Sequence, residues 1–276
     1  MNKVWLVTGA SSGFGRAITE AAVAAGDVVV GAVRRPEVLD DLVAAHPDQV
    51  EALRLDVTDT AAAGAAVQDV IARHGRIDVL VNNAGRTHVG AFEETGEDEL
   101  RALFEVHVFG PAALTRAVLP HMRERRSGAI VQMSSMGGQM SFAGFSAYSG
   151  TKFALEGLSE GLADEVRDFG IKVLIVEPGA FRTALFAQDR AGVSADSGLY
   201  PKVSATRGLV EGGDGTQPGD PAKAAAVILE ALNAEETPLR LPLGDDGVEA
   251  VLAHLDQVRT DIAAWEKRSR ATAFEA

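Results

Sequence analysis

A tyrosine and a lysine stand four residues apart in the segment AYSGTKFALEGLSEGLADEV, at Tyr148 and Lys152. On a helix both side chains emerge from one face, so the phenol and the ammonium can approach a common point. A free tyrosine has a pKa of about 10 and is a poor acid or base at neutral pH, but a nearby positive charge favours the phenolate. The pair predicts a tyrosine that exchanges a proton with a substrate. A solvated helix face is the alternative for such a pair in isolation.

Ser135 lies thirteen residues before the tyrosine and ends the segment GAIVQMSS. In open α/β sheets, ligands bind at the carboxyl ends of the strands, which is where this serine is expected. Its hydroxyl can hydrogen-bond a carbonyl or alkoxide oxygen. We therefore expect Ser135 to steady the substrate beside Tyr148.

The stretch TGASSGFG, residues 8–15, follows the first apolar segment and opens the first helix. Its glycines permit a tight turn and close approach to a pyrophosphate, while the helix N-terminus offers free N–H groups to the anion. An unliganded glycine turn is the alternative for the triplet alone. We expect a nucleotide to contact this loop, at Gly9, Ser11, Ser12, Gly13, Phe14 and Gly15.

Two arginines, Arg34 and Arg35, end the segment VVVGAVRR. An acidic side chain there would bind the ribose 2′-hydroxyl of NAD and repel the extra phosphate of NADP, and none is present. An arginine fork suits a phosphate monoester. The sequence favours NADP over NAD, although a solvated surface pair would look the same.

Seven short apolar segments alternate with longer helical ones, and this alternation predicts a parallel sheet covered by helices on both faces. We expect an α/β fold of the doubly wound Rossmann type, in a single domain over residues 1–276. The segments are VWLVT, DVVVGAV, VEALRLDV, IDVLVNN, GAIVQMSS, IKVLIVEPG and PLRLPLG.

The amino-acid composition excludes several classes of binding partner. The chain carries 39 acidic and 26 basic residues, a formal charge of −13, which repels nucleic-acid phosphates and anionic membranes. It has no cysteine, which excludes thiol nucleophiles, disulfides and thiolate metal sites, and we expect no metal. No charged leader precedes the first apolar segment, and no segment approaches a membrane-spanning length. We expect a cytoplasmic protein without nucleic-acid or membrane partners.

The chain resembles the short-chain dehydrogenase/reductase family from about Lys3 to Thr183. The resemblance is carried by motifs in the order and spacing of that family: the glycine loop, NNAG at residues 82–85, Ser135, YSGTK and PGAFRT. The resemblance implies hydride transfer between a nicotinamide nucleotide and a carbonyl/alcohol pair. Tyr148 then serves as general acid/base, with Ser135 and Lys152 beside it. It also implies cofactor contacts for Tyr148, Lys152, Asp56, Val57, Asn83, Ala84, Gly85, Pro178, Gly179, Phe181 and Thr183. Turn formation is the alternative for the asparagines.

His107 departs from the family, which has a catalytic asparagine at this position that acts mainly through its backbone carbonyl on a water beside the lysine. Pro111 has no N–H, so the carbonyl of His107, four residues earlier, loses its helical partner. We expect a local kink that turns this carbonyl toward a water beside Lys152. The alternative is that Gly110 and Pro111 serve helix packing and that His107 is a packed polar residue.

The substrate region is marked by large apolar side chains, which favour a lipophilic or aromatic ketone or alcohol but could equally be core packing. They are Met136, Met140, Phe142, Phe145 and Phe186. The segment of about residues 184–220 is rich in Gly, Ser and Asp and is long for a connection, so we expect a loop that covers the substrate.

Two other function classes are alternatives. An NAD(P)-binding sensor would keep the glycine loop but lose the tyrosine or the lysine, and both are present. A halohydrin dehalogenase would replace the nucleotide loop and carry an arginine in place of the lysine, so Lys152 and the glycines Gly9, Gly13 and Gly15 argue against it.

Members of the family commonly pair the helices around residues 98–124 and 148–169, so we expect a homodimer or homotetramer. The last predicted helix, Gly247–Arg268, is amphipathic and is expected to pack on the sheet edge or on a neighbouring subunit. Its apolar positions are Val248, Val251, Leu252, Leu255 and Val258.

Overall fold

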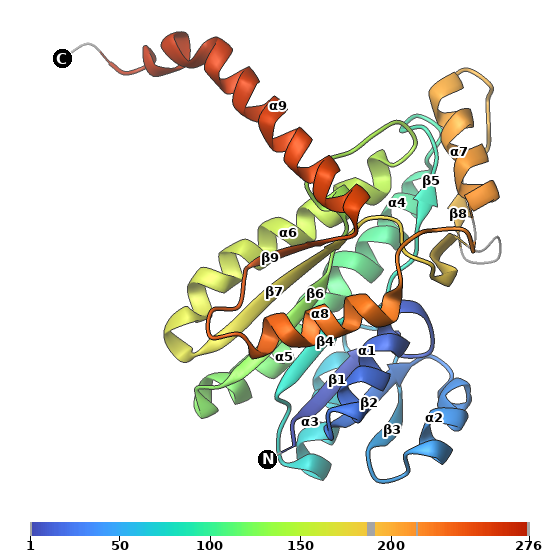
Figure 1. The fold of residues 1–276 in the computed structure, drawn as a ribbon, viewed down its shortest axis with the longest axis vertical. Helices are drawn as coiled ribbons and strands as arrows, with labels where there is room; N and C mark the ends of the chain where they lie inside the picture. The colour runs from blue at the N-terminus through green and yellow to red at the C-terminus, as the bar shows by residue number, and fades with distance from the viewer. Residues whose placement is uncertain (1, 187–190, 214, 275–276) are drawn as a thin grey trace.

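The computed structural model describes residues 2–186, 191–213 and 215–274. Within these residues, the seven predicted segments form one sheet in the order β3-β2-β1-β4-β6-β7-β9, and every neighbouring pair is parallel (Figure 1). The predicted doubly wound fold is confirmed. Its strands are β1 (Val4–Thr8), β2 (Val28–Val33), β3 (Val50–Arg54), β4 (Val79–Asn82), β6 (Gly128–Met133), β7 (Ile171–Pro178) and β9 (Arg240–Leu243).

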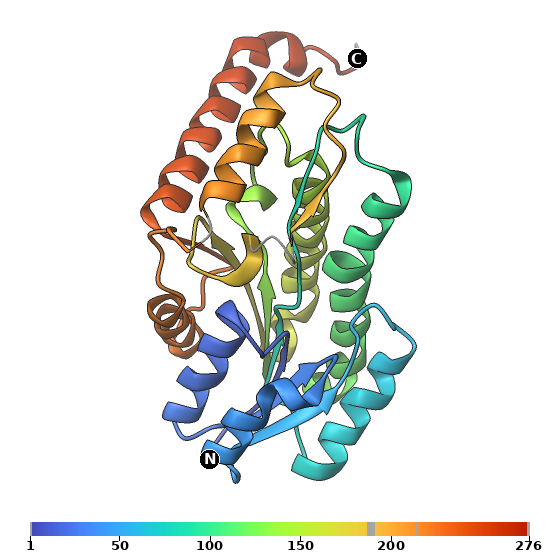
Figure 2. The same cartoon turned by 90° about the vertical axis from the view of Figure 1, so that its right-hand side faces the viewer.

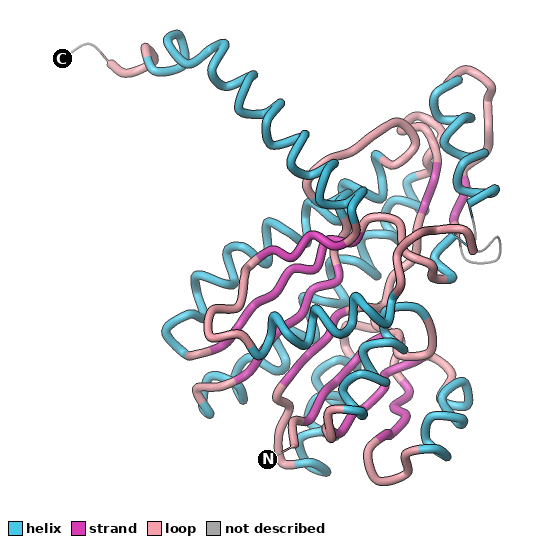
Figure 3. The backbone as a smooth tube through the Cα atoms, in the orientation of Figure 1, coloured by secondary structure: helices cyan, strands magenta, loops and turns pink. Residues whose placement is uncertain are grey.

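Helices cover both faces of the sheet, whose strands lie side by side between them (Figure 3). One face carries α1 (Gly13–Ala24), α2 (Asp40–Ala45) and α8 (Pro221–Asn233), and the other carries α3 (Ala62–His74), α5 (Gly110–Arg125) and α6 (Ser146–Val166). Short 3₁₀ helices complete the chain at Pro36–Leu39, Met136–Gly138, Arg167–Phe169 and Ala184–Phe186.

Two hydrophobic cores result, because successive strand residues point to opposite faces. In β1, Val7 packs with Ile18 and the other residues of one core, whereas Leu6 packs with Leu114 and those of the other. The inner strands are buried on both faces and read as continuous apolar runs, which explains why the sequence pattern located them, whereas the edge strands β3 and β9 are only partly buried.

One helical run, Glu97–Arg125, joins α4 (Glu97–Phe104), a π-helical turn (Glu105–Phe109) and α5. By length and composition, it is the one helix among the described residues that could cross a bilayer, so the expectation that no segment reaches this length was wrong. Leu103, Leu114 and Met122 on it are nevertheless fully buried within the protein. The run is apolar because it covers one face of the sheet.

The predicted covering loop contains regular structure. Its described part holds β8 (Gly192–Val193), which pairs with β5 (His88–Val89), and α7 (Pro201–Gly213). The expectation of a plain loop was therefore wrong, and residues 187–190 and 214 of this segment lie outside the described residues. The helix α7 stands at the carboxyl end of the sheet (Figure 2).

The last helix, α9 (Asp245–Arg270), packs on the protein only through its first turns and then extends away from it (Figure 1). Gly247 and Val251 are buried, and the Asp246 carboxylate accepts a hydrogen bond from the Ala180 N–H at 2.7 Å. Leu252, Leu255 and Val258 stay exposed. The predicted packing on the protein body therefore holds for the base of the helix alone.

Candidate active site

A large cavity of about 800 Å³ opens at the carboxyl ends of the strands, where the strand order reverses between β1 and β4. It brings together all of the predicted site residues except Gly15. They are Gly9, Ser11, Ser12, Gly13, Phe14, Arg34, Arg35, Asp56, Val57, Asn83, Ala84, Gly85, His107, Ser135, Tyr148, Lys152, Pro178, Gly179, Phe181 and Thr183.

The glycine loop is held in a shape that glycine alone accommodates. Gly9 and Gly13 have φ angles of +65° and +54°, in the left-handed region that strains other residues. A Cβ on Gly15 would lie 2.3 Å from the Gly9 carbonyl oxygen, so the third glycine lets the helix α1 pack against the loop. The predicted role of Gly15 at the nucleotide is therefore indirect: it shapes the loop from behind.

Asn83 fastens this loop to the neighbouring strand. Its amide donates hydrogen bonds to the carbonyl oxygens of Thr8 (2.8 Å) and Gly9 (3.2 Å). The Thr8 hydroxyl accepts hydrogen bonds from the backbone N–H groups of Asn83 and Ala84. The Asn83 side chain therefore has a structural role. Thr8 supports the same loop and was not predicted from the sequence.

The far end of the cavity is positively charged. Arg34 and Arg35 are exposed at the end of β2, and both line the cavity. Asp56 lies near them, and its pKa is lowered first by a hydrogen bond from the Thr58 N–H and also by the charge of Arg34. This end of the cavity is suited to an adenosine that carries an anionic group.

Tyr148, Ser135 and Lys152 meet in the buried middle of the cavity. The Tyr148 hydroxyl hydrogen-bonds Ser135, and the Lys152 ammonium lies 5.7 Å from the tyrosine ring centre and donates to the Met133 carbonyl at 2.8 Å. The Ser135 hydroxyl oxygen also accepts a bond from the Gly137 N–H, which fixes its orientation. A proton donor, a second hydroxyl and a cation therefore face one small volume.

Burial dominates the electrostatics of this group. It raises the pKa of Tyr148 to about 12, against the lowering effect of the Ser135 hydrogen bond, and it lowers the pKa of Lys152 to about 8, against the charge of Glu156. The sequence predicts that the ammonium, together with an oxidised nicotinamide, pulls the tyrosine pKa downward. In this geometry Lys152 stands over the ring and donates to a carbonyl, so desolvation prevails and the phenol stays protonated.

His107 is fully buried, and both of its ring nitrogens are engaged. Nε2 accepts from the Arg86 N–H at 3.2 Å, and Nδ1 lies 2.8 Å from the Thr151 hydroxyl, which itself donates to the Tyr148 carbonyl. Burial, then the charges of Lys152 and Arg86, keeps the pKa of His107 well below its usual value. The imidazole is neutral and packs edge-on against Tyr148, with ring centres 5.6 Å apart.

The backbone widens into a π-helical turn around His107. The Gly110 N–H bonds the Glu105 carbonyl five residues earlier, which makes a π-helical turn inside a continuous helix. A Cβ on Gly110 would lie 2.5 Å from the Val57 carbonyl oxygen, so close packing also requires this glycine. The helix is therefore locally disrupted where the sequence predicts it, in the form of a π-helical turn, and the turning of the His107 carbonyl toward a water beside Lys152 stays a prediction.

Behind Lys152 lies a buried carboxyl pair that the sequence analysis missed. Glu156, one helical turn after the lysine, hydrogen-bonds Glu177 of β7, and two carboxyls can do so only around a shared proton. Gln139 donates to Glu177 at 2.7 Å, and Arg240 donates to Glu156 at 3.0 Å. Burial, then the charge of Glu156, raises the pKa of Glu177 to about 7. An acidic residue inside the apolar run IKVLIVEP was the available signal.

The remaining wall of the cavity is apolar. Met136, Phe142, Phe145 and Phe186 line it as expected, whereas Met140 is not among its lining residues in the described chain. Val210 of α7 packs with Phe145, Tyr148 and Phe186, so the predicted covering segment does contact this wall.

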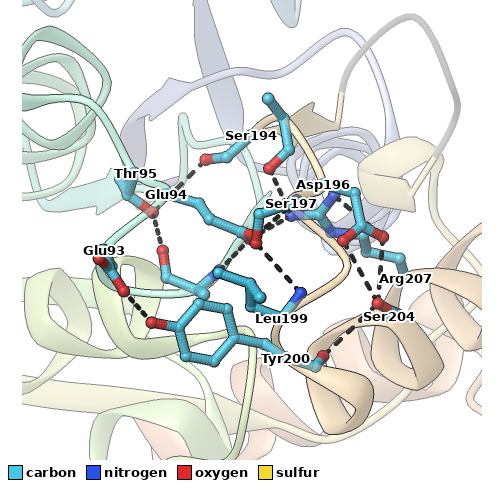
Figure 4. A network of polar contacts seen from close by, with 12 residues as sticks. Glu93, Glu94, Thr95, Ser194, Asp196, Ser197, Leu199, Tyr200, Ser204 and Arg207 are labelled. Atoms are coloured by element: carbon cyan, nitrogen blue, oxygen red, sulfur yellow. Dashed lines mark hydrogen bonds and ion pairs between the residues drawn. The ribbon is translucent and has the colours of Figure 1, made fainter.

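Polar contacts anchor α7 to the loop that follows β5 (Figure 4). Arg207 and Glu94 form a buried ion pair at 2.7 Å, and the Ser197 N–H donates to the same Glu94 carboxylate at 2.8 Å. The Tyr200 hydroxyl donates to Glu93. The segment after Phe186 is therefore fixed to the body of the protein at both of its described elements, β8 and α7.

The chain matches known proteins along its length. A family model described as short chain dehydrogenase matches residues 3–194. "Oxidoreductase BOA17" from Botryotinia fuckeliana is 36% identical over 274 residues, which cover 99% of this chain and 100% of the relative. A "3-ketodihydrosphingosine reductase" from Bacteroides thetaiotaomicron is 41% identical over 181 residues, 66% of this chain and 65% of the relative.

Solved structures agree with the fold. A short-chain dehydrogenase from Streptomyces avermitilis is 66% identical, with a TM-score of 0.93, and the match covers 99% of this chain and 98% of that one. A metagenomic short-chain oxidoreductase in complex with NADP is 29% identical, with a TM-score of 0.68 and coverage of 87% and 95%. A Burkholderia phymatum structure in complex with NAD, 22% identical over 100% of this chain and 98% of that one, has a TM-score of 0.80 and shows likeness of fold.

The carboxyl pair predicts an unusual dependence of stability on pH. Because the pKa of Glu177 rises from 4.5 to about 7 on folding, the folded chain holds a proton there that the unfolded chain has lost. The free energy of unfolding should therefore fall as pH rises from 4.5 to 7, with a slope of up to about 1.4 kcal/mol per pH unit from this group. Glu177→Gln should remove that contribution, as measured by urea unfolding across this range.

Glu160→Gln is the matched control. Glu160 also pairs with Arg240, at 2.6 Å, but it is 62% exposed. Its substitution should leave the slope unchanged. An identical pH profile for Glu177→Gln and the unmodified chain would contradict the shared proton.

Proposed function

The chain belongs to the short-chain dehydrogenase family, and we propose that it interconverts a ketone or aldehyde and the corresponding alcohol with NADP(H) as cofactor. The observation that carries the proposal is the meeting of Tyr148, Ser135 and Lys152 in the cavity that begins at the glycine loop. Oxidoreductase chemistry is common to the family, whereas the CH–OH substrate and the tyrosine mechanism are our proposals.

The cavity is suited to a dinucleotide on the evidence of its own residues. Left-handed glycines at Gly9 and Gly13 expose the backbone at the start of α1, and Arg34 and Arg35 follow the neighbouring strand β2 beside this loop. The glycine loop would hold the diphosphate and the arginines the 2′-phosphate, while the nicotinamide supplies or accepts the hydride when bound.

Tyr148 and Ser135 then handle the substrate oxygen. During reduction, the protonated phenol donates its proton to the developing alkoxide, and the Ser135 hydroxyl donates a hydrogen bond to the same oxygen. Lys152 supplies a positive charge beside the phenolate that this step leaves behind, and the Met133 carbonyl holds it in place. In the oxidation direction the phenolate accepts the proton again.

The substrate we propose is lipophilic or aromatic. Phe142 and Phe145 pack with ring centres 4.8 Å apart on the cavity wall, and Phe186 lies against the same cluster. The name of one relative, a 3-ketodihydrosphingosine reductase, is consistent with an apolar carbonyl compound. Apolar walls bury such a substrate and exclude water from the transferred hydride.

NADP is the cofactor we propose over NAD, because two exposed arginines and no acid end β2. Arg34→Ala/Arg35→Ala should raise the KM for NADPH by about 10- to 100-fold, since each lost charge-assisted hydrogen bond costs on the order of 1.5–3 kcal/mol, and leave the KM for NADH nearly unchanged. Arg54→Ala, an exposed arginine at the end of β3, is the control. An equal loss with both nucleotides would count against the assignment.

Tyr148→Phe should lower kcat by about 10²- to 10⁴-fold in a screen of carbonyl substrates with NADPH, because the variant has no proton to donate. Nucleotide binding, followed by fluorescence, should be retained. Tyr200→Phe is the matched control, since Tyr200 is the other of the two tyrosines and lies on the surface. Undiminished turnover by Tyr148→Phe would reject this mechanism.

A nucleotide-binding sensor with little turnover is the second candidate, and the observation that favours it is His107 in place of the family's asparagine. Nucleotide binding without turnover of any compound in the same screen would support it.

His107→Asn distinguishes backbone from side-chain action. Asparagine is too short to keep both imidazole hydrogen bonds, so stability should fall by about 1–3 kcal/mol while kcat is largely retained. Thermal unfolding and steady-state kinetics measure the two effects. A collapse of kcat in a folded variant would show that the imidazole itself takes part.

A further inference from the structure

The outer part of α9 presents apolar side chains to solvent over several helical turns. From Leu255 to Arg270 every residue is exposed, including Leu255 at 47%, Ile262 at 64% and Trp265 at 61%. Figure 1 shows this part of the helix standing clear of the rest of the chain. Most helical stability in proteins comes from the packing of an apolar face, so a surface that covers these side chains would stabilise the helix.

The apolar residues of α9 form a coiled-coil seam. They recur with alternating steps of three and four at Val248, Val251, Leu255, Val258, Ile262 and Trp265. Val248, Leu255 and Ile262 are seven residues apart, as are Val251, Val258 and Trp265, which is the heptad repeat that keeps one face turned toward a second helix. Val251 is covered by the protein itself, whereas the seam beyond it is exposed to solvent, with the Arg268 guanidinium 5.1 Å from the Trp265 ring centre.

The charged residues beside the seam indicate which helix could pack against it. Arg259 and Glu266 stand seven residues apart on one flank, and Asp261 and Arg268 stand seven apart on the other. Against a parallel copy, Asp261 would face Glu266 of that copy, which is repulsive. Against an antiparallel copy with Ile262 opposite Trp265, each flank places an arginine opposite an acid.

A second copy of α9 carries the charges that are complementary to those of the first. Arg259 meets Glu266 of the second copy, Asp261 meets its Arg268, and the twofold axis repeats both pairs. The present partners are weakly held: Glu266 pairs with Arg270 at 2.8 Å and Asp261 accepts from Gln257 at 2.9 Å, all on an exposed surface where such contacts exchange easily.

We propose that the seam of α9 is a docking surface for a second copy of this chain, whose α9 lies antiparallel along it with Ile262 opposite Trp265 of the partner. The interface is isologous and lies far from the cavity, so it forms whether or not the chain turns over a substrate. It adds a specific surface to the general expectation of a homo-oligomer.

Spin labels test the geometry, because the chain has no cysteine of its own. Ala264→Cys lies near the twofold axis, and labels there should be within about 20 Å of each other, whereas labels at Glu249→Cys should be about 45 Å apart at 1.5 Å of rise per residue. A parallel pair would give short distances at both positions. Either that result or the absence of any distance at Ala264→Cys would overturn the proposal.

Ile262→Glu tests the seam and should lower the assembly by one step in sedimentation velocity, from dimer to monomer, or from tetramer to dimer where the helices around residues 98–124 and 148–169 also pair. Ala263→Glu adds the same charge outside the seam and should leave the assembly unchanged. An assembly that Ile262→Glu does not alter would place every interface elsewhere and overturn the proposal. Trp265 reports the same event, since its fluorescence should shift to the blue with rising protein concentration while Trp5, already buried, does not change.

Charge reversal tests the register. Glu266→Arg should weaken the dimer by placing two arginines together, and Arg259→Glu/Glu266→Arg should restore it with the pair inverted. Failure of the double variant to recover would overturn the antiparallel register. A monomer whose Trp265 shifts only with vesicles of neutral phospholipid would assign the seam to a lipid surface and overturn the proposal.

Discussion

The burial of the Lys152 ammonium is the constraint on which the centre of this structure depends. A buried cation is costly unless polar groups and opposite charge replace its water. The Met133 carbonyl supplies one hydrogen bond, and Glu156 supplies charge one turn along α6. Glu156 is itself buried and is held by Glu177 and Arg240. One buried ammonium therefore depends on side chains from α6, β7 and the edge strand β9.

A second set of contacts keeps the nucleotide end in shape without touching the reacting atoms. Thr8 and Asn83 join the ends of β1 and β4, and Gly15 allows α1 to approach the loop that they hold. The parallel order of the strands brings these ends together, so the motif depends on the sheet as much as on its own residues.

The sequence predicted the features that depend on residues close together in the chain. The inner strands are buried and read as apolar runs. Motif residues that follow strands had to meet at one edge of the sheet, as Gly9, Asn83 and Ser135 do. The π-helical turn, the α7 helix and the Glu156–Glu177 pair could not be predicted in the same way. Each depends on partners distant in sequence, such as Val57 for Gly110, Glu94 for Arg207 and Arg240 for Glu156.

The base of α9 connects the carboxyl-terminal region to the cavity. Asp246 holds the Ala180 backbone, and Ala180 and Gly179 both line the cavity wall. Truncation is therefore tolerated unevenly along this helix. A chain shortened to just beyond Val251 keeps its cavity wall, whereas one cut before Asp246 loses the hydrogen bond that holds Ala180.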